Sequence, residues 1–299
     1  MPTLPETATL ETVLITGASS GIGRATALEL AGRGARLVLV ARGEESLDDT
    51  ADQARAAGAG DVLVRAADVT DEDAVRAAVD AAVETFGRLD AVVHAAQVMA
   101  YGTIEEVPRE VFETVVETAV HGTAVIARVV LPLFREQGAG HLLVVNSLLG
   151  QVATPLMGSY IAAKWGQLGL VRVLQQEVRD APGVEVSIIQ PGGVDTPIYT
   201  QAASWAGSTG RPPPPVYSAE RLGRRVVALL DRPRRQVQAG IFNPLITAGF
   251  RLLPGVYDYL VGPLLQRMAI ADDDVPPTEG NVFASRPQGN ATGGRSRSI

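Results

Sequence analysis

Residues 16–23 read TGASSGIG, and this stretch decides the fold that the sequence encodes. It follows a short apolar run and precedes a helical stretch, so it marks a turn from a strand into a helix. Gly17 permits a sharp turn, Gly21 lets the main chain approach a phosphate group, and Gly23 lets the helix pack closely against the strand. The start of the helix offers unpaired N–H groups to such a phosphate. The pattern favours a nucleotide-binding loop over an ordinary strand-to-helix turn.

The first two thirds of the chain alternate short apolar runs with helical patterns, which is typical of βαβ units. The predicted strands span residues 12–15, 36–40, 61–65, 91–94, 142–145 and 184–190. The predicted helices span residues 22–31, 44–57, 71–86, 109–137 and 160–179. The stretch 109–137 is either two helices or one helix broken near Gly122. We therefore expect an α/β fold, a single-domain Rossmann fold over residues 1–240 with a doubly wound parallel sheet and helices on both faces.

The chain changes character after residue 190. Residues 191–217 are rich in Gly, Ser and Pro and predict a long ordered loop, before a helix at 218–230 and a last strand at 236–239. Residues 241–270 are apolar and predict a helical extension that covers a pocket or forms an interface. A membrane or lipid contact is the less favoured interpretation, because the basic residues of interfacial helices are mostly missing. Residues 271–299 are polar, and we expect them to be disordered.

Composition excludes several classes of protein. A net charge of −7 argues against a nucleic-acid partner, which usually needs a concentrated basic face. The absence of cysteine rules out disulfides, thiolate metal sites and a cysteine nucleophile. His94, His121 and His141 are scattered without ligand spacing, so no metal site is expected. The first residues lack the basic and apolar stretches of a secretory signal, so we expect a cytoplasmic protein.

The end of the second predicted strand bears on which dinucleotide the loop would bind. NAD-binding proteins of this architecture place a carboxylate there for the ribose 2′-hydroxyl, whereas an arginine suits a 2′-phosphate. The strand runs LVLVAR, with Ala41 at the carboxylate position and Arg42 after it. Arg42 offers a planar fork to a phosphate, although a surface arginine in an arginine-rich chain is the alternative. The sequence favours NADP(H) over NAD, and Ser20 adds no second positive charge.

Ser147, Tyr160 and Lys164 form a second cluster. Ser147 follows a predicted strand at the edge where open parallel sheets bind ligands. Lys164 is the sole lysine of the chain and lies one helical turn after Tyr160, on the same helix face. A neighbouring ammonium favours the phenolate and lowers the pKa of a tyrosine, which suits acid–base work. Without further motifs, a tyrosine and a lysine at this spacing more often serve packing and solvation than catalysis.

Taken together, these motifs make the chain resemble the short-chain dehydrogenase/reductase family over roughly residues 10–240. TGASSGIG matches the family's cofactor loop, Asp68 and Val69 match its adenine side, and Ser147, Tyr160 and Lys164 match its catalytic serine and YxxxK. The segment PGGVDTP at 191–197 resembles the one whose Val194 and Thr196 would meet the nicotinamide carboxamide. The cofactor-binding residues that the resemblance implies are Gly17, Ser19, Ser20, Gly21, Ile22, Gly23, Arg42, Asp68, Val69, Ala95, Tyr160, Lys164, Pro191, Gly192, Val194 and Thr196.

The resemblance implies hydride transfer between a nicotinamide and a carbonyl or secondary-alcohol carbon. Tyr160 would be the general acid/base, Lys164 would hold the nicotinamide ribose and lower the tyrosine pKa, and Ser147 would polarise the carbonyl. The substrate pocket would come from residues 98–104, 148–157 and the loop after Thr196, which are apolar and suggest a small hydrophobic ketone or alcohol. A homodimer or homotetramer is expected by the same resemblance.

Two residues depart from the family pattern. Gln97 stands where the family has a glycine that permits close approach to the cofactor. Ala119 stands where the family has an asparagine that helps to bind a water joined to the lysine. These departures keep a second hypothesis open, in which the chain binds NADP(H) as a non-catalytic sensor or scaffold.

Overall fold

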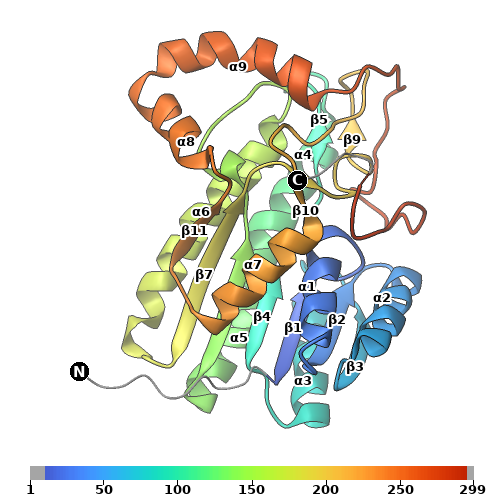
Figure 1. The fold of residues 1–299 in the computed structure, drawn as a ribbon, viewed down its shortest axis with the longest axis vertical. Helices are drawn as coiled ribbons and strands as arrows, with labels where there is room; N and C mark the ends of the chain where they lie inside the picture. Colours follow the sequence, from blue (N-terminus) through green and yellow to red (C-terminus); the bar gives the residue numbers. More distant parts are fainter. Residues whose placement is uncertain (1–10, 295–299) are drawn as a thin grey trace.

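The computed structural model describes residues 11–294, without the side chains of residues 265 and 266. Seven parallel strands form the central sheet in the order β11-β7-β6-β4-β1-β2-β3 (Figure 1). Their bounds are β1 (Thr12–Thr16), β2 (Arg36–Ala41), β3 (Asp61–Ala66), β4 (Ala91–His94), β6 (Gly140–Val145), β7 (Val184–Pro191) and β11 (Gln236–Ala239). Each predicted strand overlaps one of these. The sheet confirms the doubly wound Rossmann fold.

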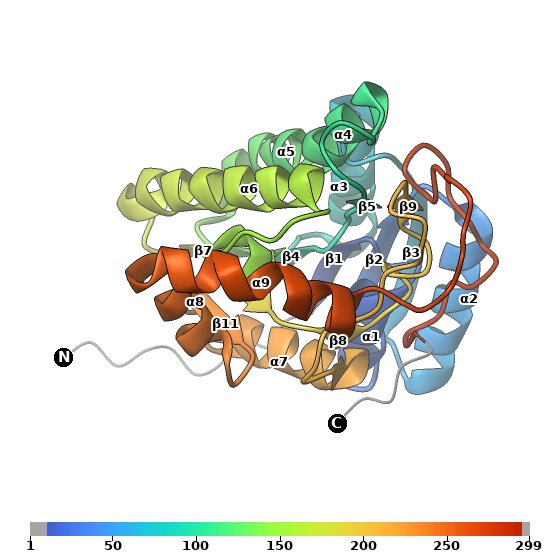
Figure 2. The ribbon, with the colours of Figure 1, turned by 90° about the horizontal axis from the view of Figure 1, so that it is seen from above.

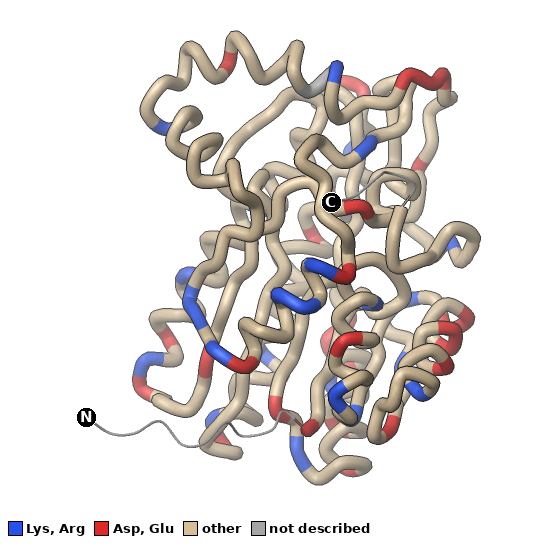
Figure 3. Tube along the Cα trace, in the orientation of Figure 1, with Lys and Arg blue, Asp and Glu red and all other residues tan. Residues whose placement is uncertain are grey.

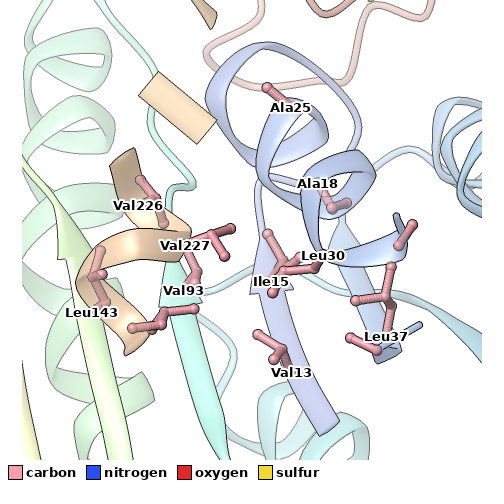
Figure 4. Close-up of a cluster of buried hydrophobic side chains, with 14 of the residues drawn as sticks. Val13, Ile15, Ala18, Ala25, Leu30, Leu37, Val93, Leu143, Val226 and Val227 are labelled. Atoms are coloured by element: carbon pink, nitrogen blue, oxygen red, sulfur yellow. The ribbon is translucent and has the colours of Figure 1, made fainter. Parts of the chain in front are cut away.

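Helices cover both faces of the sheet, as Figure 2 shows. One face carries α1 (Gly21–Ala31), α2 (Glu44–Ala57) and α7 (Ala219–Asp231). The other carries α3 (Glu72–Phe86), α4 (Arg109–Val116), α5 (Gly122–Gln137) and α6 (Gly158–Glu177). Side chains along a strand point alternately to the two faces, and both faces are buried here. Val13 and Ile15 pack under α1 and α7 with Val226 (Figure 4), whereas Leu14 belongs to the core on the opposite face.

The stretch predicted as two helices or one broken helix is continuous. A π-helical turn, η1 (Glu117–His121), joins α4 to α5, and Gly122 continues the helix with ordinary right-handed dihedral angles. A side chain at Gly122 would press against Val69, so the glycine permits close packing rather than a break. The whole run Arg109–Gln137 is apolar and long enough to cross a membrane by length and composition alone. Its apolar face packs in the core against the sheet, which accounts for the same composition.

The loop after β7 is ordered through short strand pairs. β8 (Val194–Asp195) pairs with β10 (Tyr217–Ser218), and β9 (Ala203–Ser204) pairs with β5 (Ala100–Tyr101). The apolar extension forms α8 (Asn243–Leu252) and α9 (Pro254–Ala269), which lie above the carboxyl edge of the sheet (Figure 1). The extension therefore stands over the edge where the sequence predicted the ligand site.

Residues 271–294 differ from the expected disorder. This segment, which we call the C-terminal strap, runs from α9 past β9 towards α2 (Figures 1 and 2). Thr278 exchanges two main-chain hydrogen bonds with Ser204, and Val282 is fully buried. Polar composition suggested a chain unable to bury itself, but main-chain pairing and a few apolar anchors attach the strap to the domain. The remainder of the predicted tail, residues 295–299, lies outside the described residues, as does the N-terminal segment 1–10 on which the secretory-signal expectation rested.

Candidate active site

A cavity of about 600 Å³ opens at the carboxyl edge of the sheet, beneath α8 and α9. Of the site residues predicted from the sequence, all except Lys164 line this cavity. It extends from the glycine loop and Arg42 to Ser147 and Tyr160. Its shape thus joins the predicted cofactor residues and the predicted catalytic residues in one continuous space.

The glycine loop has the dihedral angles and close contacts that require glycine. Gly17 has φ +69°, and a Cβ there would lie 2.8 Å from the main-chain nitrogen of Ala96. A Cβ at Gly23 would collide with the carbonyl of Gly17. Gly21 has φ +51°, and a Cβ there would lie 3.2 Å from the side chain of Thr196. The loop therefore brings the start of α1 against the segment after β7, where the two sides of a dinucleotide site would meet.

Ser147, Tyr160 and Lys164 come together as the spacing predicted. Ser147 caps the short helix η2 (Leu148–Gly150), its Oγ accepting from the Leu149 N–H at 3.1 Å. Its hydroxyl is also hydrogen-bonded to Tyr160. Lys164 lies beneath Tyr160, with Nζ 5.7 Å from the centre of the phenol ring and 3.1 Å from the Val145 carbonyl oxygen to which it donates. Hydroxyl, phenol and amine thus follow one another from the cavity into the protein.

Burial, rather than the lysine charge, dominates the acid–base properties of the pair. Burial raises the pKa of Tyr160 to about 12, and the Ser147 hydrogen bond opposes this rise. Burial lowers the pKa of Lys164 to about 7, because the ammonium loses its hydration. The sequence had predicted a Tyr160 pKa lowered by the ammonium, so the direction differs. A phenol that keeps its proton at neutral pH is suited to donate it.

The two departures from the family pattern lie beside this site. Gln97 turns its side chain away from the cofactor loop, its Nε2 donating to the Val98 carbonyl at 2.8 Å and to the Val115 carbonyl at 3.4 Å. The glycine loop accordingly keeps its close contact with Ala96. Ala119 is fully buried in the π-helical turn and offers only its carbonyl oxygen.

More segments line the substrate end of the cavity than the sequence indicated. The expected apolar residues line it, including Val98, Met99, Leu148, Leu149, Val152 and Met157. α8, α9 and the residue between them add Ile246, Leu253, Val256, Tyr257, Leu260 and Leu264. The Tyr257 hydroxyl donates to the Ala153 carbonyl at 3.0 Å, and Phe250 makes edge contacts with Trp165 and Tyr257, which hold the two helices in place. Few charged residues lie along α8 and α9 (Figure 3).

At the cofactor end of the cavity, the C-terminal strap makes contacts that the sequence did not predict. Arg42 donates to the main-chain carbonyls of Val282 at 2.7 Å and Asn281 at 2.6 Å. The Gly21 N–H donates to the Ala291 carbonyl at 2.8 Å. The strap therefore occupies donors at two positions predicted to bind phosphate. A polar segment without periodicity gave no sign of where it would dock.

Comparison with known proteins places this architecture in a family. The family described as short chain dehydrogenase matches residues 11–207. The chain belongs to the short-chain dehydrogenase family. This short-chain dehydrogenase is 34% identical over 199 residues to oxidoreductase BOA17 of Botryotinia fuckeliana, a match that covers 67% of the chain and 69% of that relative. It is 29% identical to the oxidoreductase YxnA of Bacillus subtilis, over 90% of the chain and 76% of the relative.

Solved structures give the same family. An alcohol dehydrogenase from the archaeon Thermococcus sibiricus, complexed with 5-hydroxy-NADP, aligns with a TM-score of 0.66 and 28% identity, covering 76% of this chain and 94% of that one. Levodione reductase aligns with a TM-score of 0.67 and 29% identity, covering 77% and 95%. The short-chain dehydrogenase described here is thus a family oxidoreductase whose C-terminal extension and strap lie beyond residues 11–207, the stretch that the family matches.

Proposed function

We propose that this chain is an NADP(H)-dependent oxidoreductase that interconverts a hydrophobic carbonyl compound and a secondary alcohol, with Tyr160 as general acid/base. The observation that carries the proposal is the order of Ser147, Tyr160 and Lys164 at one end of a cavity whose other end holds the glycine loop and Arg42. The family relationship supports the oxidoreductase class. The NADP analogue bound by the Thermococcus sibiricus alcohol dehydrogenase supports the cofactor class.

The residues present fit a dinucleotide. Gly17, Gly21 and Gly23 bring main-chain N–H groups and the start of α1 to the cavity, where the pyrophosphate would bind. Arg42, whose guanidinium lies near the Asp68 charge, would bind the 2′-phosphate. The strap carbonyls that Arg42 and Gly21 now contact would have to give way to these phosphates.

The proposed chemistry divides between the cofactor and the three polar residues. When bound, the nicotinamide supplies a hydride to the carbonyl carbon. Ser147 Oγ accepts from the Leu149 N–H, and its hydroxyl, now hydrogen-bonded to Tyr160, would donate its proton to the carbonyl oxygen of a substrate. Tyr160, whose pKa burial holds at about 12, retains its proton at neutral pH and donates it to the developing alkoxide. The ammonium form of Lys164 stabilises the phenolate left behind.

The substrate class follows from the cavity walls. The residues around Ser147 and Tyr160 are apolar, and α8 and α9 close the cavity with further apolar side chains. Burial of apolar substrate surface against these walls would provide the binding energy. We infer a hydrophobic ketone or aldehyde as the substrate for reduction.

The experiment compares NADPH oxidation by the wild type, Tyr160→Phe and Tyr199→Phe over a panel of aromatic and aliphatic ketones and aldehydes. Tyr199 is a second tyrosine on the same cavity, so Tyr199→Phe removes an equivalent hydroxyl without removing the proposed acid. We expect a fall of at least about 100-fold in kcat for Tyr160→Phe and a small change for Tyr199→Phe. Wild-type turnover by Tyr160→Phe would contradict the mechanism. NADPH binding without turnover by the wild type would favour the sensor or scaffold hypothesis.

A further inference from the structure

Gln167 is a buried residue whose hydrogen-bonding groups are all engaged around Lys164. It lies one turn after Lys164 on α6 and is 1% exposed. Its Oε1 accepts from Lys164 Nζ at 3.0 Å and from Asn146 Nδ2 at 2.9 Å. Its Nε2 donates to Thr123 Oγ1 at 2.9 Å and to the Ala119 carbonyl at 3.3 Å. These four hydrogen bonds fix the orientation of the amide, with its oxygen towards the lysine.

The place that Gln167 reaches is the π-helical turn where the family pattern has an asparagine. Ala119 has no polar side chain to offer there, but its main-chain carbonyl accepts from Gln167 Nε2 as well as from the Thr123 hydroxyl. We propose that Gln167 is a positioning residue, which holds the Lys164 amine in place and links it directly to the π-helical turn in the absence of that asparagine. The inference rests on the proposed role of Lys164 in the reaction.

The surroundings of Lys164 leave Gln167 as one of few groups that favour its charged form. The titratable groups that face Lys164 are Tyr160 on its own helix and His94 on β4. Burial lowers the pKa of His94 to about 3, so His94 is neutral at physiological pH. Within residues 11–294, no carboxylate forms an ion pair with Lys164. Its charge is therefore held by the oxygens of Val145 and Gln167.

Lys164 is the sole lysine, so isotope-labelled lysine gives a single side-chain resonance whose pH titration reports this residue directly. Gln167→Met removes the acceptor at similar volume, and we expect the proton affinity of Lys164 to fall about tenfold, the loss of one hydrogen bond to a charge. Gln167→Glu places a carboxylate there and should raise that affinity. Gln175→Met is the matched control, because Gln175 is a buried amide on the same helix that donates to Val186 and Arg235 carbonyls instead.

Equal titration midpoints in the wild type, Gln167→Met and Gln167→Glu would overturn the proposal, as would an equal shift in Gln175→Met. The two Gln167 variants must shift in opposite directions, so either one that folds tests the proposal. The same proteins are assayed with acetophenone and NADPH, where kcat should fall about tenfold in Gln167→Met and change little in Gln175→Met. A titration that shifts as expected while acetophenone and other ketones are not turned over would refute the proposed function alone. A shifted Lys164 titration in Gln167→Met together with a kcat equal to that of the wild type would refute the positioning role.

Discussion

Replacing Lys164 with methionine should abolish activity and stabilise the protein at neutral pH. Burial lowers the pKa of Lys164 from 10.5 to about 7. A base whose pKa is lower in the folded state takes up its proton more readily when unfolded, so its burial destabilises the fold below pH 10.5. For this shift the cost is roughly 4 kcal/mol at pH 7 and about 2 kcal/mol at pH 9. The free energy of unfolding of the wild type should therefore rise by about 2 kcal/mol between these pH values.

Lys164→Met removes this titration, so its free energy of unfolding should not show that rise. The variant leaves the oxygens of Val145 and Gln167 without the lysine donor, which costs about 1–3 kcal/mol, so its net gain at pH 7 should be roughly 1–3 kcal/mol. Urea unfolding at pH 7, 8 and 9 measures these values. Tyr160→Phe, which keeps the lysine, serves as the control and should keep the rise. A flat profile in the wild type, or a rise that persists in Lys164→Met, would refute the conclusion that burial lowers the pKa of Lys164.

Three further predictions concern the cofactor site and acid stability. In steady-state kinetics, Arg42→Ala should raise the KM for NADPH at least about tenfold and leave the KM for NADH nearly unchanged. Equal effects on the two KM values would contradict binding of the 2′-phosphate by Arg42. Asn290→Ala removes hydrogen bonds that hold the strap to Ser46 and Gln201. Because the strap must give way to the cofactor phosphates, calorimetry should find that this variant binds NADPH a few-fold more tightly. Weaker binding would show that the strap supports the cofactor. Burial lowers the pKa of His141 to about 4, so the unfolded state binds a proton that the folded state does not between pH 6.5 and 4. His141 should contribute about 3 kcal/mol to the fall in the free energy of unfolding over that range, and His141→Leu should lose this part of the acid sensitivity in urea titrations.

Much of the fold could be predicted because its signals are local. The glycine loop and the continuous apolar strands each depend on a few neighbouring residues. The continuity of α4 and α5 could not be predicted, because Gly122 in isolation is a helix breaker. Its glycine is needed for packing against Val69, a residue more than 50 positions earlier in the chain.

The sequence could predict that the candidate site residues come together, but not their energetics. Ser147, Tyr160 and Lys164 were found by spacing, yet the raised pKa of Tyr160 comes from burial that only the folded chain determines. Gln167 lies three residues after Lys164, a helical spacing that could have drawn attention to it, but its partners Ala119 and Thr123 come from another helix. The strap was missed because main-chain carbonyls, which every sequence has, make its contacts with Arg42 and Gly21.

The central claim is that a proton from Tyr160 accompanies transfer of a hydride within this cavity. The most direct measurement uses NADPH in which both hydrogens at the nicotinamide C4 are deuterium, and a ketone substrate such as acetophenone, with mass spectrometry of the alcohol product. We predict one deuterium on the carbinol carbon for the wild type and a product yield at least about 100-fold lower for Tyr160→Phe. An alcohol without deuterium, or equal labelled product from Tyr160→Phe, would contradict the account.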